Sequence, residues 1–201
     1  MDEIKFMEKP EWVSWEDVSE CIYRSHQTNK SHGFEMVNAN ITADELKSDL
    51  KEGHCFVALE GNRVVGTASI KFFKNKRKWW TKDMVAYYCY DAILPEYRGT
   101  DVFFGLNEIR RLCFKQSGVR IHQFHTAEYN KTVLKINEKG GFKKVQYAPT
   151  GKGAKYYSVT MVKWMDGCPY SDWFINLMFN LSKFVAKTFW TPGYKLRFWP
   201  K

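Results

Sequence analysis

The sequence has 201 residues, enough for one well-filled core with at most a small appendage. Its content of 44% hydrophobic and 17% aromatic residues excludes a disordered chain. The excess of 31 basic over 22 acidic residues gives a formal charge of +9. That charge favours anionic partners in general, such as a nucleotide-bearing cofactor, nucleic acid or an anionic membrane surface, without choosing among them.

The cysteines give no sign of a disulfide framework or a zinc site. There are five of them, an odd number, widely spaced and without a CxxC or Cys/His pattern. The acidic start MDEIKF does not resemble a signal peptide. No apolar stretch reaches the length of a membrane-spanning helix. We therefore expect a cytoplasmic protein with reduced cysteines and no metal site.

The first half of the chain predicts two helices followed by strands. The segment Ser14–Gln27 has an acidic first turn and an apolar stripe, which is typical of a helix. Thr42 and Glu45 have the spacing of a capping box and open a second helix that ends at Gly53. The hydrophobic period then changes to that of β-strands. The predicted strands are His54–Leu59, Arg63–Phe73 and Met84–Leu94.

The second half alternates helices and strands. Apolar residues at helical spacing predict a helix over Val102–Gln116. The elements expected after it are a strand Val119–Thr126, a helix from about Tyr129 to Lys139, and strands Phe142–Tyr147 and Lys155–Trp164. The order ααβββαβαββ predicts a mixed sheet flanked by helices, in the α+β or α/β class.

We expect one domain over residues 1–166 and a basic, aromatic extension over residues 167–201. In the extension Ser171 and Asp172 cap a predicted helix that runs to about Thr188 and has a wide apolar face. Such a face needs a cover, which is either the rest of the domain or a second copy in a homodimer. The functional alternative is a peripheral contact with an anionic membrane, made by an interfacial helix.

A basic hairpin tip, Lys74–Lys78, leads into Trp79 and Trp80. Bases of a nucleic acid can stack on aromatic faces, so the tip could contact nucleic acid. The simpler interpretation is a solvated tip beside two packed tryptophans. We therefore do not expect nucleic acid to be the main partner.

Three landmarks in the chain resemble the GNAT superfamily of acyl-CoA-dependent N-acyltransferases. They are the segment Phe56–Ser69, the segment Leu94–Gly99 (LPEYRG) leading into a helix, and Asn130 followed by Gly141 and Phe142. Their order and distances are similar to those of the family over residues 12–164. The resemblance implies an α+β fold with a mixed, mostly antiparallel, splayed sheet flanked by helices.

The loop before the third helix has a physical reason to bind a diphosphate. A strand that ends in a glycine-bearing turn directs the free amides of the next helix, and the helix dipole, at one spot. The resemblance implies acetyl-CoA as cosubstrate. The cofactor-binding positions that it implies are Ala92, Ile93 and Leu94 for the pantetheine arm, Arg98, Gly99, Thr100, Asp101, Val102, Phe103 and Phe104 for the diphosphate, and Asn130 at the start of the next helix.

Three positions depart from the family pattern. Asp101 and Phe103 replace small residues of the loop, where a carboxylate repels a diphosphate or caps the helix itself and a phenyl ring crowds the cofactor. Asn137 stands where many members have a tyrosine that protonates the leaving thiolate, and an amide cannot act as that acid. These departures favour one alternative, a GNAT-like binding module without transferase activity.

Acyl transfer to an amine needs a positioned amine, a base, and a donor to the carbonyl oxygen. The residues that we single out for catalysis are Asp91, His125, Tyr87 and Asn137. Asp91 is the least ordinary, because a carboxylate inside an apolar strand must be exposed, paired or shifted in pKa. For each of the tyrosines and histidines a structural role is the more common interpretation. Further candidates by location are Tyr88, Tyr90, His122, Tyr156 and Tyr157.

The function that the sequence favours is transfer of an acetyl group from acetyl-CoA to a primary amine. An amino sugar or another small metabolite is expected ahead of a protein as the acceptor. The alternatives left open are the inactive binding module and a nucleic-acid-associated protein.

Overall fold

The structure is a computed structural model, and it describes residues 3–31, 36–74, 78–150, 156–191 and 195–196. The chain divides into two compact units. The first contains residues 1–73 and 86–119, and the second contains residues 74–85 and 120–201. Both units combine helices with mostly antiparallel strands, which confirms the predicted α+β class.

The strands of the first unit follow the order β1-β2-β3-β4. β1 pairs antiparallel with β2, and β2 pairs antiparallel with β3. The strands are β1 (Ile4–Glu8), β2 (Gly53–Glu60), β3 (Arg63–Lys74) and β4 (Met84–Ile93). The helices are α1 (Trp15–Ser31), η1 (Val37–Asn40), α2 (Ala43–Asp49), η2 (Pro95–Tyr97) and α3 (Val102–Ser117).

Local signals placed the helices of this unit well. The capping box of α2 is present, because Thr42 Oγ1 accepts from the Glu45 amide at 3.2 Å and Glu45 accepts from the Thr42 amide at 2.9 Å. α2 is nevertheless shorter than predicted and ends at Asp49, because Gly53 already begins β2. β1 was not predicted at all. It becomes a strand by pairing with β2, in a register that sets Ile4 opposite Glu60.

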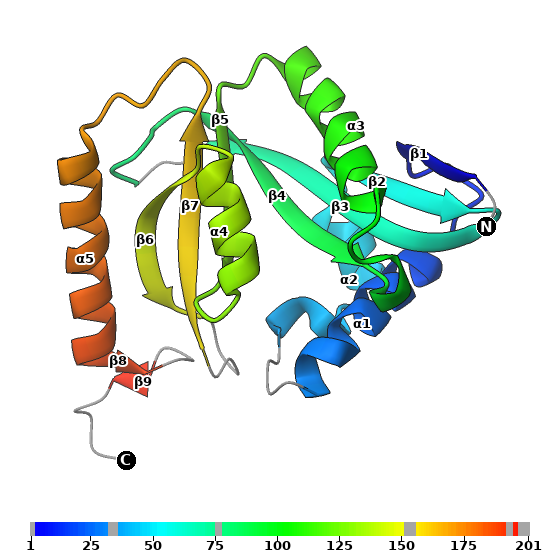
Figure 1. Cartoon of the computed structure of the whole chain (residues 1–201), viewed down its shortest axis with the longest axis horizontal. Helices are drawn as coiled ribbons and strands as arrows, with labels where there is room; N and C mark the ends of the chain where they lie inside the picture. The colour runs from blue at the N-terminus through cyan, green and yellow to red at the C-terminus, as the bar shows by residue number, and fades with distance from the viewer. Residues whose placement is uncertain (1–2, 32–35, 75–77, 151–155, 192–194, 197–201) are drawn as a thin grey trace. The chain divides into compact units, whose positions relative to one another are not determined.

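The helices of the first unit cover opposite faces of its strands (Figure 1). A Cβ built on Gly66 of β3 would lie 2.9 Å from Val102 of α3. Lys71, five residues further along β3, lies 2.6 Å from Asp49 at the end of α2. Since side chains alternate along a strand, α3 lies on one face and α2 on the other.

Apolar side chains from α1, α2 and the strands form the core of this unit. The largest fully buried side chains of the helices on this side are Ile22 and Leu46. They belong to the same buried cluster as Phe56 and Leu59 of β2 and Ile70 of β3. The burial of five such side chains stabilises the unit by roughly 1.5–3 kcal/mol each, and it fixes β3 as the support for α3.

The strands of the second unit follow the order β5-β7-β6, with both pairs antiparallel. Figure 1 shows α5 lying alongside β6. The predicted helix of the extension is confirmed, with Ser171 accepting from the Phe174 amide at 3.3 Å as its cap. The elements are β5 (Ile121–Ala127), α4 (Lys131–Lys139), β6 (Lys143–Pro149), β7 (Tyr157–Trp164), α5 (Asp172–Phe189), β8 (Trp190–Thr191) and β9 (Lys195–Leu196).

Two predicted elements of the domain fall partly outside the described residues, as do residues 192–194 and 197–201 of the predicted extension. The predicted start of β7, Lys155, is one of them, and β7 begins at Tyr157 among the described residues. The centre of the basic tip, residues 75–77, is the other. The tryptophans after the tip pack within the second unit: Trp80 Nε1 donates to Gln123 Oε1 at 3.0 Å, and the Trp79 ring lies 5.4 Å from that of Tyr170. This is the packing that the simpler interpretation of the tip predicts.

Within the described ranges, no helix has both the length and the apolar character needed to cross a membrane.

Candidate functional site

The turn after β4 is fixed by contacts within the first unit. The Leu94 amide donates to the Val65 oxygen of β3 at 3.0 Å, and the Leu94 oxygen accepts from the Tyr97 amide at 2.9 Å. The Tyr97 hydroxyl in turn donates to Glu60 at 2.5 Å. Both backbone groups of Leu94 are therefore engaged in the turn, so they are not open to a pantetheine arm.

The Arg98 side chain is bound to α1. Its guanidinium donates to Thr28 Oγ1 at 2.9 Å and to the Ser25 oxygen at 2.5 Å. Burial, and then the nearby Arg98 cation, lower the pKa of His26 to about 4. A neutral His26 therefore lies beside the guanidinium at neutral pH. Arg98 acts first as an anchor of the loop, so an anion at the loop would be bound chiefly by backbone amides.

The loop turns at Gly99, whose φ of 79° lies in the left-handed region that favours glycine. Thr100 then closes the turn, because its hydroxyl donates to the Tyr97 oxygen at 2.6 Å and accepts from the Val102 amide at 3.4 Å. This local network brings the chain into α3 with a defined direction.

Asp101 is the N-cap of α3, but its side chain makes no capping hydrogen bond within the described chain. Its oxygen accepts from the Gly105 amide at 2.9 Å, which is the first bond of the helix. The amides of Phe103 and Phe104 therefore remain as first-turn donors without an intrahelical partner. The expectation that Asp101 could occupy these donors is not what the structure shows, so the two amides stay open.

The two phenylalanines at the start of α3 are exposed to solvent. The exposed fraction is 41% for Phe103 and 69% for Phe104, and their ring centroids lie 5.6 Å apart. Because the Phe103 ring is not packed into the loop, the shape of the loop does not depend on it.

Gly66 brings α3 close to the sheet. A Cβ at this position would lie 2.9 Å from Val102 Cγ1 and 3.1 Å from Leu106 Cδ1, both on buried side chains. A glycine is therefore required for this close approach. It sets the depth at which the first turn of α3, and with it the loop, sits over β3.

β4 carries a backbone irregularity that the sequence did not indicate. Tyr90 has a φ of 55°, which is unusual for a tyrosine inside a strand. Tyr87 and Tyr90 both reach the face covered by α2, since Lys71 Nζ lies 5.8 Å from the Tyr87 ring centroid and the Tyr90 hydroxyl donates to Asp49 at 2.6 Å. Residues three apart in a regular strand point to opposite faces. The left-handed Tyr90 therefore shifts the alternation, as an extra residue in a bulge does.

The same shift brings Tyr88 and Asp91 together on the α3 face. Arg110 Nη1 lies 2.6 Å from Asp91 Oδ1, and the guanidinium lies 4.0 Å from the Tyr88 ring centroid. Burial opposes the charge of Arg110, but Asp91 and the Tyr88 hydroxyl outweigh it and raise the pKa of the guanidinium. Asp91 is thus a paired carboxylate, one of the three states that its place in the sequence allowed.

The polar cluster on the α2 face has a defined charge state. Burial opposes ionisation of Asp49, but hydrogen bonds from Lys71 and Tyr90 outweigh it and lower the pKa of the carboxyl group. Burial raises the pKa of both Tyr87 and Tyr90 well above the usual value, with the Asp49 carboxylate adding to the effect. Both tyrosines are therefore neutral hydroxyls at physiological pH, able to donate a hydrogen bond but poor donors of a proton.

In the second unit, Asn130 caps α4. Its Oδ1 accepts from the Val133 amide at 3.3 Å, and its Nδ2 donates to Thr126 at 3.3 Å. Asn137 is engaged in the same helix, where its Nδ2 donates to the Val133 oxygen at 2.9 Å. Both asparagines thus have local structural partners.

The histidines and tyrosines of this unit differ in exposure. His125 is the exposed residue of β5, whereas His122 is buried with its ring 6.2 Å from that of Phe142. Tyr156 and Tyr157 are also buried, and the Tyr157 hydroxyl donates to the Trp190 oxygen at 2.9 Å. Among these side chains His125 is the one placed to meet a solute.

The second unit also contains a carboxylate–phenol pair that the sequence did not single out. The Tyr147 hydroxyl donates to Glu128, which follows β5 directly. The Tyr147 ring stacks on that of Tyr157 at 5.1 Å. Residues so far apart in sequence gave no motif, so only the fold could reveal the pair.

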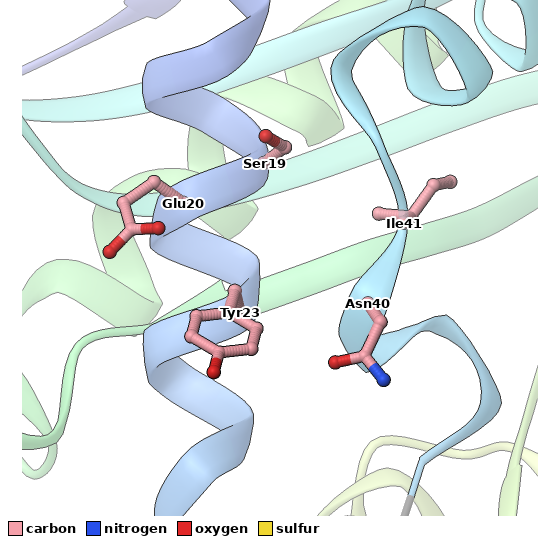
Figure 2. A pocket seen from close by; sticks show the side chains of 5 residues that line it. All are labelled: Ser19, Glu20, Tyr23, Asn40 and Ile41. Carbon is pink, nitrogen blue, oxygen red and sulfur yellow. The ribbon is translucent and has the colours of Figure 1, made fainter.

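The first unit has an open groove between α1 and the segment that precedes α2. Figure 2 shows its lining side chains, with Ser19, Glu20 and Tyr23 on α1 and Asn40 and Ile41 on the facing segment. Its volume is about 300 Å³. A carboxylate, a phenol and an amide can each accept a hydrogen bond from an amine. The lining therefore offers the acceptors that an amine needs.

A metal centre is not suggested by the described residues, which contain no group of three or more His, Cys, Asp or Glu side chains close enough to hold an ion.

Comparison with known proteins gives a fold. Neither a family model nor a curated protein sequence matches the chain. Solved structures do match. The chain is similar to the NatC complex bound to Gag peptide and CoA, with a TM-score of 0.63, 12% identity, and coverage of 82% of this chain and 99% of that one.

Two further acetyltransferase structures are similar to the chain, with slightly lower TM-scores. For an acetyltransferase of the GNAT family from Streptococcus pneumoniae the TM-score is 0.58 at 16% identity. For the PaiA N-acetyltransferase of Thermoplasma acidophilum in complex with coenzyme A it is 0.56 at 15% identity. Each comparison covers 81% of this chain and 99% of the other.

The fold is therefore that of the GNAT acetyltransferases, which confirms the resemblance seen in the sequence. Since the solved structures are covered almost completely while 82% of this chain is covered, the chain carries additional length beyond the shared fold.

Proposed function

We propose that the protein is an N-acetyltransferase that moves the acetyl group of acetyl-CoA to a primary amine. The observation that carries the proposal is the start of α3, where a glycine-bearing loop ends in first-turn amides that Asp101 leaves open. Similar folds hold CoA in two of the solved structures named above. We place it in the cytoplasm, in keeping with five cysteines that show no disulfide pattern.

The residues of the loop fit a diphosphate. The amides of Phe103 and Phe104 can donate to its oxygens, and the positive end of the α3 dipole adds an attraction of about 0.3–1 kcal/mol. The carboxylate of Asp101 opposes it by like-charge repulsion. Arg98 holds the loop in place through its hydrogen bonds to Thr28 and Ser25 of α1. We therefore expect binding that is weaker than an unsubstituted loop would give.

The bound cosubstrate would supply an acetyl thioester with CoA thiolate as the leaving group. The amine nitrogen forms a bond to the acetyl carbon, the carbon–sulfur bond breaks, and the nitrogen proton passes to a base while the thiolate receives a proton. We assign the base to His125, because it is exposed and imidazole is the side chain that most often serves as a general base. We assign hydrogen-bond donation toward the leaving sulfur to Tyr87, whose raised pKa keeps it a neutral hydroxyl, so that the proton of the thiol comes from solvent.

Two other residues expected in catalysis receive supporting roles. Asp91 is held by Arg110, so it positions β4 against α3 rather than accepting a proton. Asn137 hydrogen-bonds its own helix and cannot act as an acid, so the chemistry relies on a CoA thiol being a tolerable leaving group. General acid–base assistance is worth about 10²–10⁴-fold, which such an enzyme can partly forgo.

For the acceptor we propose an amino sugar or another small amine ahead of a protein. The side chains that line the groove beside α1 are suited to an amine, because Glu20 can pair with an ammonium group. The NatC structure contains a Gag peptide, so a peptide amine belongs in the same acceptor screen.

The test is calorimetric titration with acetyl-CoA of the parent protein and of three variants. We expect a parent Kd on the micromolar scale, about −8 kcal/mol, and tighter binding by Asp101→Gly. Phe103→Pro removes one amide donor in the first turn, where proline is tolerated. It should weaken binding, whereas the matched Phe103→Ala should not.

If Asp101→Gly binds acetyl-CoA and the parent does not, the parent has the fold but has lost the ability to bind the cosubstrate, which refutes the enzyme assignment. Absence of binding by the parent and Asp101→Gly would refute the cosubstrate altogether. Equal affinities for Phe103→Pro and Phe103→Ala would show that the α3 amides do not carry the binding.

A further inference from the structure

α5 has one face packed against the second unit and one face open to solvent. Ile175 and Ala186 are buried on the packed face, which lies against β6. On the other face large apolar side chains are exposed. Their exposed fractions are 71% for Trp173, 48% for Leu177, 53% for Leu181, 63% for Phe184, 41% for Val185 and 45% for Phe189.

The exposed residues Trp173, Leu177, Leu181 and Phe184 form one stripe, which we call the α5 stripe. They follow each other at four, four and three residues, the spacing of a single helical face. Val185 widens the stripe by one position. A contiguous apolar stripe of this length is unusual on a soluble surface and marks a contact site.

The stripe is held in place by polar contacts on the packed face. The Tyr147 amide of β6 donates to Ser182 Oγ at 2.9 Å, and the Tyr157 hydroxyl donates to the Trp190 oxygen at 2.9 Å. At the N-terminal end Asp172 lies 2.9 Å from Lys143 Nζ. Since these contacts fix the rotation of α5, the stripe faces outward as part of the folded unit.

Beyond Asp172 at its start, the charged side chains of α5 are all basic. Lys183 and Lys187 are exposed on the same helix, and both ammonium groups lie within 6 Å of the Tyr147 ring, at 5.9 and 5.6 Å from its centroid. Asp172 is the last acidic residue of the chain and is paired with Lys143. The residues after it include the basic residues Lys183, Lys187, Lys195, Arg197 and Lys201 and no acidic residue.

We propose that α5 binds an anionic lipid surface, lying flat with its stripe in the interface and its lysines beside the headgroups. Tryptophan, leucine and phenylalanine on one face with lysine at the border is the composition of an interfacial helix. A second copy of the chain is the less favoured occupant, because each copy carries a formal charge of +9 and two such surfaces repel. This inference does not depend on acyl transfer.

The lipid surface contributes two separable forces. Burial of the stripe is apolar and resists salt, whereas attraction of the lysines to anionic headgroups is screened within about 8 Å at physiological ionic strength. Each lysine near an anionic surface strengthens binding several-fold. We therefore expect binding to require both anionic lipid and the stripe.

The experiment is co-sedimentation of the full chain with vesicles of phosphatidylcholine alone and of phosphatidylcholine mixed with phosphatidylglycerol. We expect binding to the mixed vesicles and at least about tenfold less to the neutral ones. Leu181→Asp with Phe184→Asp should reduce binding to the mixed vesicles by at least about tenfold. The matched control is Leu112→Asp on α3, since Leu112 is 50% exposed and lies outside the stripe. It should bind as the parent does.

A second pair of variants tests the charges. Lys183→Ser with Lys187→Ser should weaken binding to mixed vesicles and reduce its dependence on salt, while Lys115→Ser on α3 should not. All variants are compared by urea unfolding, so that a loss of binding by an unfolded protein is recognised.

Three results would overturn the proposal. One is a parent protein that stays in the supernatant with mixed vesicles. Another is a loss of binding by Leu112→Asp as large as that of the stripe variant. The third is a parent that light scattering without lipid shows as a dimer, which Leu181→Asp converts to a monomer. That outcome would assign the stripe to a second copy.

Discussion

Asp91 Oδ1 lies 2.6 Å from Nη1 of Arg110, and the two side chains differ greatly in burial: that of Arg110 is 4% exposed, that of Asp91 48%. The ion pair joins β4 to α3 just beyond the loop that we assign to the cosubstrate. It therefore links the stability of the first unit to the position of the proposed site.

The asymmetry of this pair predicts unequal costs for its two deletions. Asp91→Ala leaves a buried guanidinium without its counter-charge and should lower the free energy of unfolding by about 3 kcal/mol. Arg110→Met leaves a carboxylate that water can reach, and it should cost clearly less. Urea denaturation of both variants measures the difference. A larger loss of stability for Arg110→Met would show that the cost does not arise from a buried guanidinium left without its counter-charge.

The same position separates a catalytic from a positioning role for Asp91. Asp91→Asn retains a hydrogen-bond acceptor for Arg110 but cannot accept a proton. A base at Asp91 predicts a fall in kcat of about 10²–10⁴-fold with the acetyl-CoA affinity unchanged. We expect instead a modest fall in stability and a kcat within a few-fold of the parent. A pH–rate profile that keeps its acidic limb in the Asn variant would support His125 as the base.

The left-handed backbone of Tyr90 makes an unusual prediction for a strand. In a regular strand valine is favoured over asparagine. With φ at 55°, valine is strained, whereas asparagine tolerates this region. Both variants lose the hydrogen bond to Asp49, so the comparison isolates the backbone. We expect Tyr90→Val to be less stable than Tyr90→Asn by about 1–2 kcal/mol, measured by thermal or urea unfolding. The reverse order would mean that the strand is regular.

Local chemistry explains which parts of the fold the sequence could predict. The predicted caps at Thr42 and Ser171 each involve a side chain and an amide three residues away, and both are present. The glycine-bearing loop before α3 is local in the same sense. Such signals are contained in a few neighbouring residues, so they can be recognised from the sequence alone.

The remaining features depend on partners distant in sequence. β1 is five residues long and is defined by pairing with β2, some fifty residues away. In the sequence Arg110 is an ordinary charged residue of a helix, and only the fold shows that it pairs with Asp91 of β4. Tyr90 has no side-chain signal for a left-handed backbone. The site residues that the sequence missed are therefore those whose role arises from tertiary contacts.

Gly66 should resist substitution even by alanine. The added methyl group would lie 2.9 Å from Val102 and 3.1 Å from Leu106, and both of these side chains are buried. Overpacking of this kind costs typically about 1–3 kcal/mol. Because the strain pushes on the first turn of α3, we also expect weaker acetyl-CoA binding. Calorimetry and urea unfolding check the two effects.

A compensating change tests the cause. Val102→Ala removes the contacting methyl group, so the double variant Gly66→Ala with Val102→Ala should cost less than the sum of the two single variants. Strict additivity would show that the loss at Gly66 arises from the other neighbours of the added methyl group, Leu106 and the Ala92 oxygen, and not from its contact with Val102.

His26 makes the stability of the first unit depend on pH. Its pKa in the folded protein is lowered from 6.5 to about 4, chiefly by burial and then by the Arg98 cation. The unfolded chain therefore binds a proton at a higher pH than the folded chain does. As the pH falls from about 6.5 to about 4, protonation favours the unfolded state, and this destabilisation reaches roughly 3 kcal/mol at most.

His26→Gln should therefore lose stability less steeply than the parent over that pH range, as measured by urea unfolding at a series of pH values. Carboxylates contribute in the same range, so the difference between parent and variant is the quantity that matters. Arg98→Met removes the cation but leaves the burial, and it should reduce the dependence only partly, because burial is the larger cause. If Arg98→Met and His26→Gln had equal effects, charge repulsion rather than burial would hold His26 neutral.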